Sequence, residues 1–232
     1  MKPAYRQELK FLLTMAEYRQ LRSVLQAVMG YDAHAGAGGG YNIRSLYLDD
    51  LYHTAYRQKL EGVQVRKKYR VRIYNGSDAH IALECKYKNG ACVHKQAVPL
   101  TRAEYDRFLA GDCGFLLGKP QPLAAQFYVD ARAAVLRPCV TVAYDREAFV
   151  NDVGTVRITF DRNLCAITAQ QDLFDPAAPA YHVLDPGRLI LEVKYTGILP
   201  EYIQSIFSAY SFVRTSASKF CLCVDRVNHI LR

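Results

Sequence analysis

Charged and apolar residues alternate along several short segments of this chain, and this alternation restricts the possible fold more than any other feature. The clearest case is "RKKYRVRIYN" at residues 66–75. Its cations Arg66, Lys68, Arg70 and Arg72 share one parity, and Tyr69, Val71 and Ile73 occupy the other. Because a β-strand sends alternate side chains to opposite faces, the segment predicts a strand with a row of positive charge on one side. That row is either a solvated surface or the wall of a site for an anion.

The same alternation recurs elsewhere. The charged or polar sets are Arg6/Glu8/Lys10, Glu84/Lys86/Lys88, Tyr144/Arg146, Arg157/Asp161, Glu192/Lys194 and Lys219/Asp225. In any single strand, an antiparallel sheet with one wet face would produce such a pattern. Taken together, the sets favour Arg and Lys with occasional Glu. Packing cations side by side costs repulsion, which a bound anion would relieve.

Helix signals separate the predicted strands. Thr14 with Glu17 and Thr101 with Glu104 are capping boxes, a further helix is expected in 122–136, and another opens at Pro200. The predicted strands are 5–13, 41–49, 66–75, 81–88, 93–99, 141–149, 155–162, 189–195 and 218–226, and a glycine-rich connector occupies 33–40.

The amphipathic helices need an apolar surface to cover. If they pack outside a closed sheet, the charged faces of the strands point inward. We therefore predict an α+β fold: a closed antiparallel β-barrel tunnel with a charged lumen and helices packed outside. No linker divides the chain, so a single domain over residues 1–232 is expected.

Composition narrows the class of partner and the compartment. The net charge of +8 favours an anionic partner. The seven cysteines show no CxxC spacing, which indicates reduced thiols in a cytosolic protein. The N-terminus lacks signal-peptide architecture, and no apolar segment approaches the ~20 residues of a membrane span, so a soluble, cytoplasmic protein is expected. Nucleic acid is disfavoured as a partner because basic and aromatic side chains alternate and do not share a surface.

The sequence gives little support to covalent catalysis. No Ser-His-Asp or Cys-His arrangement is visible among its residues. Carboxylates within a cationic face are either counter-ions or ligands that hold Mg²⁺ or Mn²⁺ together with substrate phosphates. Glu192 and Glu8 are the leading candidates for metal ligands.

Eight short motifs, in this order, resemble a known family. They are "YRQELKF", "YNIRSLYLDD", "KYRVRIY", "LECKYK", "AYDREAF", "VRITFD", "LEVKY" and "SKF". The chain from about residue 4 to about 228 resembles the polyphosphate polymerase domain of the vacuolar transporter chaperone (VTC) family, one of the CYTH-like triphosphate tunnel metalloenzymes. The resemblance implies an enzyme that transfers the γ-phosphoryl group of ATP to a growing polyphosphate chain, with Mn²⁺ or Mg²⁺ as cofactor.

The resemblance also implies roles for individual residues. The phosphate-binding set would be Lys10, Arg70, Arg72, Lys86, Lys95, Tyr144, Arg146, Arg157, Lys194, Ser218 and Lys219. Within it, Lys219, Arg70, Arg72 and Arg146 would be catalytic, and Glu192 with Glu8 would hold the metal. Lys219 would act as an electrostatic stabiliser, since an ordinary ammonium is already protonated at neutral pH.

Other functions of the same fold stay open. One is hydrolysis of tripolyphosphate or nucleoside triphosphates, and another is binding of polyphosphate without turnover. The first predicted strand carries only Glu8 and then Lys10, whereas the CYTH signature has several alternating Glu residues, and this favours the VTC branch. If synthesis is coupled to translocation, a separate membrane partner chain must supply the membrane part. The oligomeric state is left open.

Overall fold

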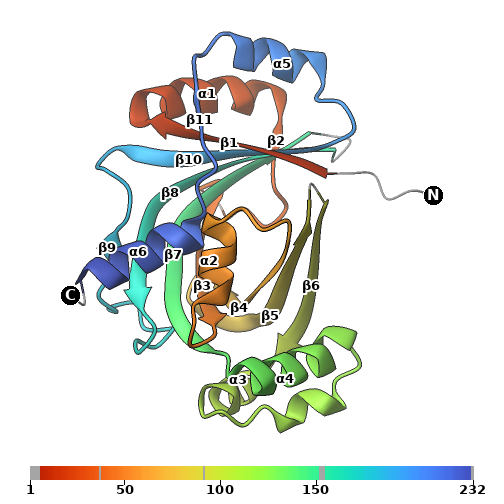
Figure 1. The fold of residues 1–232 in the computed structure, drawn as a ribbon. Helices are drawn as coiled ribbons and strands as arrows, with labels where there is room; N and C mark the ends of the chain where they lie inside the picture. Colours follow the sequence, from red (N-terminus) through yellow and green to blue (C-terminus); the bar gives the residue numbers. More distant parts are fainter. Residues whose placement is uncertain (1–5, 37, 91, 152–154, 231–232) are drawn as a thin grey trace. The chain divides into compact units, whose positions relative to one another are not determined.

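The structure, a computed structural model, describes residues 6–36, 38–90, 92–151 and 155–230 (Figure 1). The fold is α+β with a large antiparallel sheet, as predicted. Its strands are β1 (Arg6–Thr14), β2 (Gly30–Tyr31), β3 (Gly40–Asp49), β4 (Val65–Tyr74), β5 (Ser77–Asn89), β6 (Cys92–Leu100), β7 (Arg137–Val150), β8 (Val156–Thr168), β9 (Tyr181–His182), β10 (Arg188–Thr196) and β11 (Val213–Arg214). The helices are α1 (Met15–Val28), α2 (Thr54–Leu60), α3 (Arg102–Leu109), the 3-10 helix η1 (Gly114–Gly118), α4 (Pro122–Ala134), α5 (Glu201–Ser208) and α6 (Lys219–Ile230).

The sheet is open at both ends of its strand order. Among the described residues, hydrogen-bonded neighbours follow the path β11-β1-β10-β8-β7-β3-β4-β5-β6, with β2 beside β7 and β9 beside β8. This path does not return from β6 to β11, so the closed barrel that the sequence predicts is not confirmed.

The chain divides into two compact units. Unit 1 comprises Met1–Asn42, Tyr144–Leu164 and His182–Ala217. Unit 2 comprises Ile43–Ala143, Cys165–Tyr181 and Ser218–Arg232.

In unit 1, two helices cover the apolar face of the β1, β10 and β8 strands. Thr14 begins α1 with the predicted capping box: its hydroxyl accepts a hydrogen bond from the backbone N–H of Glu17 at 3.2 Å, and its own N–H donates to the Glu17 carboxylate at 2.7 Å. Leu21 and Leu25 of α1 and Ile203 of α5 are then buried against apolar strand residues. Figure 1 shows α1 and α5 on the same side of β1 and β10. The prediction that helices cover the apolar side of the strands therefore holds in this unit.

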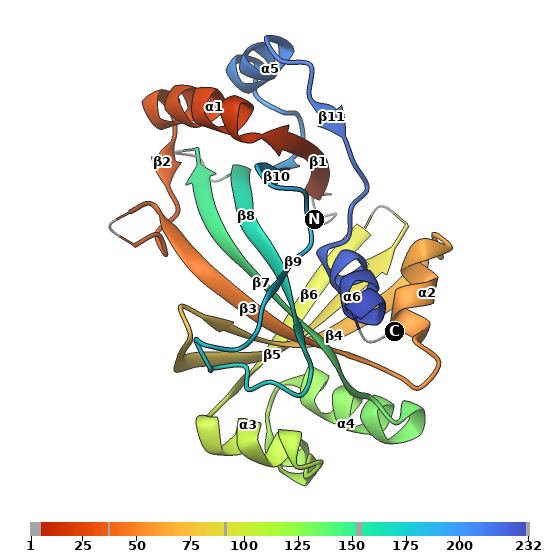
Figure 2. The ribbon, with the colours of Figure 1, turned by 90° about the vertical axis from the view of Figure 1, so that its left-hand side faces the viewer.

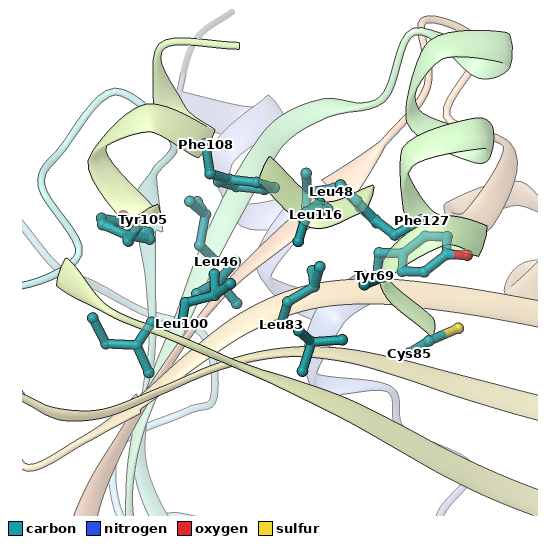
Figure 3. Close-up of a cluster of buried hydrophobic side chains, with 14 of the residues drawn as sticks. Leu46, Leu48, Tyr69, Leu83, Cys85, Leu100, Tyr105, Phe108, Leu116 and Phe127 are labelled. Atoms are coloured by element: carbon teal, nitrogen blue, oxygen red, sulfur yellow. The ribbon is translucent and has the colours of Figure 1, made fainter. Parts of the chain in front are cut away.

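In unit 2, the antiparallel strands β3, β4, β5 and β6 follow one another in sequence and in space. One face is apolar and packs beneath α3, η1 and α4. Figure 3 shows the contact layer. It contains Leu46, Leu48, Tyr69, Leu83, Cys85 and Leu100 from the strands and Tyr105, Phe108, Leu116 and Phe127 from the helices. Burying this layer fixes the parity of each strand, so that the charged residues lie on the opposite face.

Two helices of unit 2 differ from the sequence-based prediction. Residues 218–226 were expected to form a strand, and this prediction is wrong because α6 occupies Lys219–Ile230. The short helix α2 was not predicted at all. Figure 2 shows α2 and α6 side by side, and the Tyr56 hydroxyl of α2 donates a hydrogen bond to the Asp225 carboxylate of α6.

Two predicted positions lie outside the described residues. They are Tyr5, the expected start of the first strand, and Ala37 of the glycine-rich connector. All seven cysteines are free in the structure. Within the part of the chain that the structure describes, no helix combines the length and the apolar character that a membrane span requires.

Candidate functional site

The charged face of unit 2 gathers cations from three neighbouring strands. In the antiparallel register, Lys68 of β4 lies opposite Lys86 of β5, and Lys86 lies opposite Lys95 of β6. Between Arg66 and Arg72 on β4 and between Ala82 and Lys88 on β5, all of which the structure describes, Glu84 is the single carboxylate on this face. Like charges on paired strands repel each other, so this face is suited to an anion that neutralises them.

Glu84 lies at the centre of this face and is 3% exposed. Its Oε2 atom accepts from Arg70, with Nε at 2.8 Å and Nη2 at 2.6 Å, and its Oε1 atom accepts from Lys95 Nζ at 2.9 Å. Burial alone would raise the pKa of Glu84, but the positive charges of Arg70, Arg72 and Lys95 outweigh it and lower the pKa to about 2. Glu84 is therefore a carboxylate at any physiological pH.

Strand β3 supplies hydroxyl groups to the two arginines. Tyr47 accepts a hydrogen bond from Arg70 Nη1 at 2.9 Å, and Ser45 accepts one from Arg72 Nε at 3.0 Å. Burial would raise the pKa of Tyr47, but the charges of Arg70 and Arg72 dominate and lower it. Both guanidinium groups are thus fixed by side chains from a neighbouring strand.

Helix α6 begins over the same face. Lys68 Nζ lies 3.5 Å from Ser218 Oγ, 4.0 Å from Cys221 Sγ and 4.4 Å from the centre of the Phe220 ring. Phe220 also stacks on Tyr47, with ring centres 4.8 Å apart. Burial lowers the pKa of Lys68 to about 8. Ser218 and Lys219 are therefore at the start of a helix that packs on the cationic strand β4.

Unit 1 carries a second charged face, centred on Glu192 of β10. Its carboxylate contacts three cations: Lys194 Nζ at 2.7 Å, Lys10 Nζ at 3.4 Å and Arg146 Nη2 at 3.6 Å. Lys10 also lies 3.3 Å from the carboxylate of Glu8. Burial is the main cause that lowers the pKa of Lys194, although the charge of Glu192 opposes this effect.

Arg146 is paired with a residue that the predicted site did not include. Its Nε and Nη2 atoms donate to the two oxygens of Asp161 at 2.7 and 2.8 Å, and Asp161 is completely buried. Burial would lower the pKa of Arg146, but the charge of Asp161 raises it well above its usual value. Arg146 also lies over the Tyr144 ring, with Cζ 5.2 Å from the ring centre.

Arg157 of β8 lies opposite Lys194 of β10 on the same face, and its partners are Asp32 and Tyr41. Its Nη2 atom lies 2.5 Å from the Asp32 carboxylate and donates to the Tyr41 hydroxyl at 2.8 Å. With these contacts, four cations of unit 1 (Lys10, Arg146, Arg157 and Lys194) face four carboxylates (Glu8, Asp32, Asp161 and Glu192). Among these described side chains the charges balance, in contrast to the cation excess on β4 and β5 of unit 2.

The sequence as a whole matches a known family. The model of the VTC domain matches residues 5–228. The chain belongs to the VTC-domain family. No curated protein matches the sequence of this VTC domain.

Solved structures share the fold of this VTC domain at low sequence identity. A candidate adenylate cyclase from Bacillus halodurans has a TM-score of 0.53 and 15% identity, and the match covers 92% of this chain and 95% of that one. A candidate adenylate cyclase from Vibrio parahaemolyticus has a TM-score of 0.52 and 11% identity, over 94% and 97% of the two chains. A chain of the Schizosaccharomyces pombe Mediator head module has a TM-score of 0.50 and 9% identity, over 90% and 99%. At these identities the likeness concerns the fold alone.

The predicted metal ligands of the VTC domain have oxygen donors suited to Mg²⁺ or Mn²⁺. Glu8 and Glu192 share Lys10, and Thr159 lies opposite Glu192 in the β8–β10 register. The Thr159 hydroxyl is fully buried and has no hydrogen-bond partner among the described residues. Across the same described ranges, no group of three His, Cys, Asp or Glu side chains is close enough to hold a metal. A cation held by Glu8 and Glu192 would therefore need its remaining ligands from outside these carboxylates, such as phosphate and water.

Thus the structure distributes the predicted site residues of the VTC domain over two faces. Arg70, Arg72, Lys86, Lys95, Ser218 and Lys219 belong to unit 2, and Lys10, Tyr144, Arg146, Arg157, Lys194, Glu8 and Glu192 belong to unit 1.

Sequence reasoning missed the partners that hold the predicted cations. Glu84 and Asp161 each bind an arginine, and Ser45 and Tyr47 each accept from one. The position of each of these residues in the alternation of its strand could have placed it on the charged face. The antiparallel register that places each of them beside an arginine could not be read from spacing.

Proposed function

We propose that this VTC domain is an ATP-dependent polyphosphate polymerase, which transfers the γ-phosphoryl group of ATP to a growing polyphosphate chain. The observation that carries the proposal is the cation excess on the charged face of unit 2. Arg66, Lys68, Arg70 and Arg72 line β4, Lys86 and Lys88 line β5, and Lys95 lies on β6. A linear polyanion with charge on every phosphate is the kind of ligand that such a row of cations would bind.

Residues of unit 2 would recognise the phosphate oxygens. Arg70 and Arg72 offer planar guanidinium groups, which match phosphate oxygens through paired hydrogen bonds, and Lys86 and Lys95 offer mobile point charges. Ser218 and Lys219, at the start of α6, would add a hydroxyl and an ammonium. Lys219 would neutralise charge on the transferred group without exchanging a proton.

Residues of unit 1 would combine cations with carboxylates. Lys10, Lys194 and Arg146 surround Glu192, so phosphate oxygens and a dication would both find partners on this face. Glu192 and Glu8 would hold Mn²⁺ or Mg²⁺, which supplies charge neutralisation on the phosphates when bound. Tyr144 and Arg157 would contribute a hydroxyl and a further guanidinium.

Transfer itself needs little covalent help from the protein. The reaction depends on in-line positioning and on charge neutralisation at the transferred oxygens. Fixed arginines and lysines provide both, because they hold the phosphates in place and face the charge that develops. The absence of a predicted nucleophile and base is consistent with this chemistry.

The deciding experiment is incubation of the purified protein with ATP and Mn²⁺, with and without a short polyphosphate primer, followed by analysis of product length on a gel. Chain growth with release of ADP is the expected result. Release of inorganic phosphate without formation of longer chains would identify the protein as a hydrolase instead of a polymerase. Tight, salt-sensitive binding of polyphosphate without turnover would identify the protein as a polyphosphate-binding module without catalytic activity. Binding of neither ATP nor any polyphosphate would contradict all three.

A further inference from the structure

We propose that Glu84 is a positioning residue that orients Arg70 and Lys95 for phosphate binding. The inference rests on the proposed function, since it concerns how the phosphate-binding face of unit 2 is organised. It goes beyond that function because it gives a role to a negative charge within a face built for anions.

Glu84 joins three strands through its two oxygens. Oε2 accepts from Arg70 of β4, and Oε1 accepts from Lys95 of β6, while Glu84 itself belongs to β5. The same carboxylate thus sets the position of two cations that lie on either side of its own strand. The register agrees with this, because Glu84 lies opposite Arg70 on one side and Ala97 on the other, one step along the same face from Lys95.

The orientation of Arg70 is fixed from two directions. Glu84 binds the edge of the guanidinium that carries Nε and Nη2, and Tyr47 accepts from Nη1. Lys95 has a more exposed side chain, at 52%, and a long flexible one. A flexible lysine loses rotamer entropy when it becomes fixed on a bound phosphate. This cost is smaller if a partner such as Glu84 already restricts the side chain before phosphate binds.

A simple counter-ion would have the opposite effect on binding. A carboxylate in a cationic face weakens the attraction of that face for phosphate. If net charge alone determined the affinity, removing the carboxylate should tighten phosphate binding. Glu84 is also 3% exposed, and a buried carboxylate is tolerated only with well-placed partners. Positioning and net charge therefore predict opposite signs for the same substitution.

The test is calorimetric titration of the full chain with inorganic tripolyphosphate, comparing wild type with Glu84→Gln. We expect about tenfold weaker binding by Glu84→Gln, because a neutral amide holds Arg70 and Lys95 less firmly than the buried carboxylate does. The matched control is Asp78→Asn, which removes the same charge from an exposed position of β5 and should leave the affinity within about twofold. Affinity equal to wild type or tighter in Glu84→Gln would overturn the inference.

Glu84→Asp keeps the charge and shortens the side chain by one methylene, so it tests position alone and guards against misfolding of the amide variant. We expect it to bind tripolyphosphate several-fold more weakly than wild type, with an unchanged melting temperature in circular dichroism as the sign of an intact fold. Unchanged affinity in a folded Glu84→Asp would overturn the proposal. Lys95→Met should weaken binding less in the Glu84→Gln background than in wild type, and equal effects in both backgrounds would count against coupling.

These results separate the inference from the proposed function. If the wild-type protein binds tripolyphosphate but forms no polymer, the proposed polymerase activity is wrong, while the inference about Glu84 is unaffected. Wild type that binds no tripolyphosphate would overturn both.

Discussion

Arg146 and Asp161 form a two-bond ion pair inside unit 1, with Nε–Oδ1 at 2.7 Å and Nη2–Oδ2 at 2.8 Å. The side chains are 7% and 0% exposed, so neither charge has water to replace its partner. Glu192 approaches the same guanidinium at 3.6 Å. Arg146 is therefore part of the framework of the charged face as well as a predicted phosphate ligand.

Asp161→Asn should destabilise the protein strongly, because it leaves the Arg146 charge buried beside a neutral amide. The expected loss is about 3–5 kcal/mol in the free energy of unfolding. Urea unfolding followed by circular dichroism is the suitable measurement, since the chain contains no tryptophan. Asp106→Asn breaks an exposed pair with Arg102 and should cost no more than about 1 kcal/mol. Equal costs for the two substitutions would contradict the framework role.

Arg70→Ala and Arg72→Ala should each weaken binding of ATP and tripolyphosphate by about tenfold or more, because a charge-assisted pair of hydrogen bonds is lost. Arg107→Ala on α3, whose side chain is 51% exposed, is the control and should leave affinity unchanged. Calorimetric titration provides the comparison. Arginine variants that bind as tightly as the control would remove Arg70 and Arg72 from the predicted site.

Glu192→Gln should lower the affinity for Mn²⁺ by about tenfold or more, since an amide is a poorer ligand for a hard dication than a carboxylate. Electron paramagnetic resonance of free Mn²⁺ during a titration measures this without reference to activity. Glu201→Gln, which changes an exposed carboxylate in the first turn of α5 to an amide, is the matched control. If Glu192→Gln titrated like wild type, Glu192 would not be a metal ligand.

Lys68→Met should stabilise the protein at neutral pH and lose that advantage in alkali. The pKa of Lys68 is lowered by burial from 10.5 to about 8, so between pH 8 and 10.5 the unfolded chain binds the proton that the folded chain has released. The stability of wild type relative to the variant therefore rises with pH across this window. Below pH 8 we expect a difference of up to about 3 kcal/mol in favour of Lys68→Met.

Unfolding curves at pH 7 and pH 10 provide the measurement for Lys68. Lys67→Met, which changes a lysine of the opposite parity that is paired with Asp130, is the comparison variant. A constant difference between wild type and Lys68→Met at both pH values would contradict the burial of Lys68 beneath α6.

Strand parity was the part of this structure that the sequence could predict. Val71, Leu83 and their apolar neighbours are buried on one face of β4 and β5. Because side chains alternate between two faces along a strand, the charged residues between them must lie on the other face. Capping boxes at Thr14 and Thr101 were equally predictable, since each depends on two residues three positions apart.

The end of the chain was not predictable from alternation. "SKFCLCVDR" places Lys219, Cys221, Cys223 and Asp225 on one parity, yet Phe220, Cys223, Val224 and Val227 follow helical spacing and are buried in α6. Short apolar segments satisfy both periods, and packing within the fold decides between them. Helix α2 gave no signal because it is short, buries no residue and lacks a side-chain cap at His53.

Lys10 occupies the position between the two predicted metal ligands. Its ammonium lies 3.3 Å from Glu8 and 3.4 Å from Glu192, between the two carboxylates predicted to hold Mn²⁺ or Mg²⁺. A dication that bound both carboxylates would have to take the place of this ammonium, so its uptake would be an exchange of one cation for another. The apparent metal affinity would then depend on whether the displaced Lys10 finds a phosphate oxygen, and nucleotide and metal would each strengthen the binding of the other.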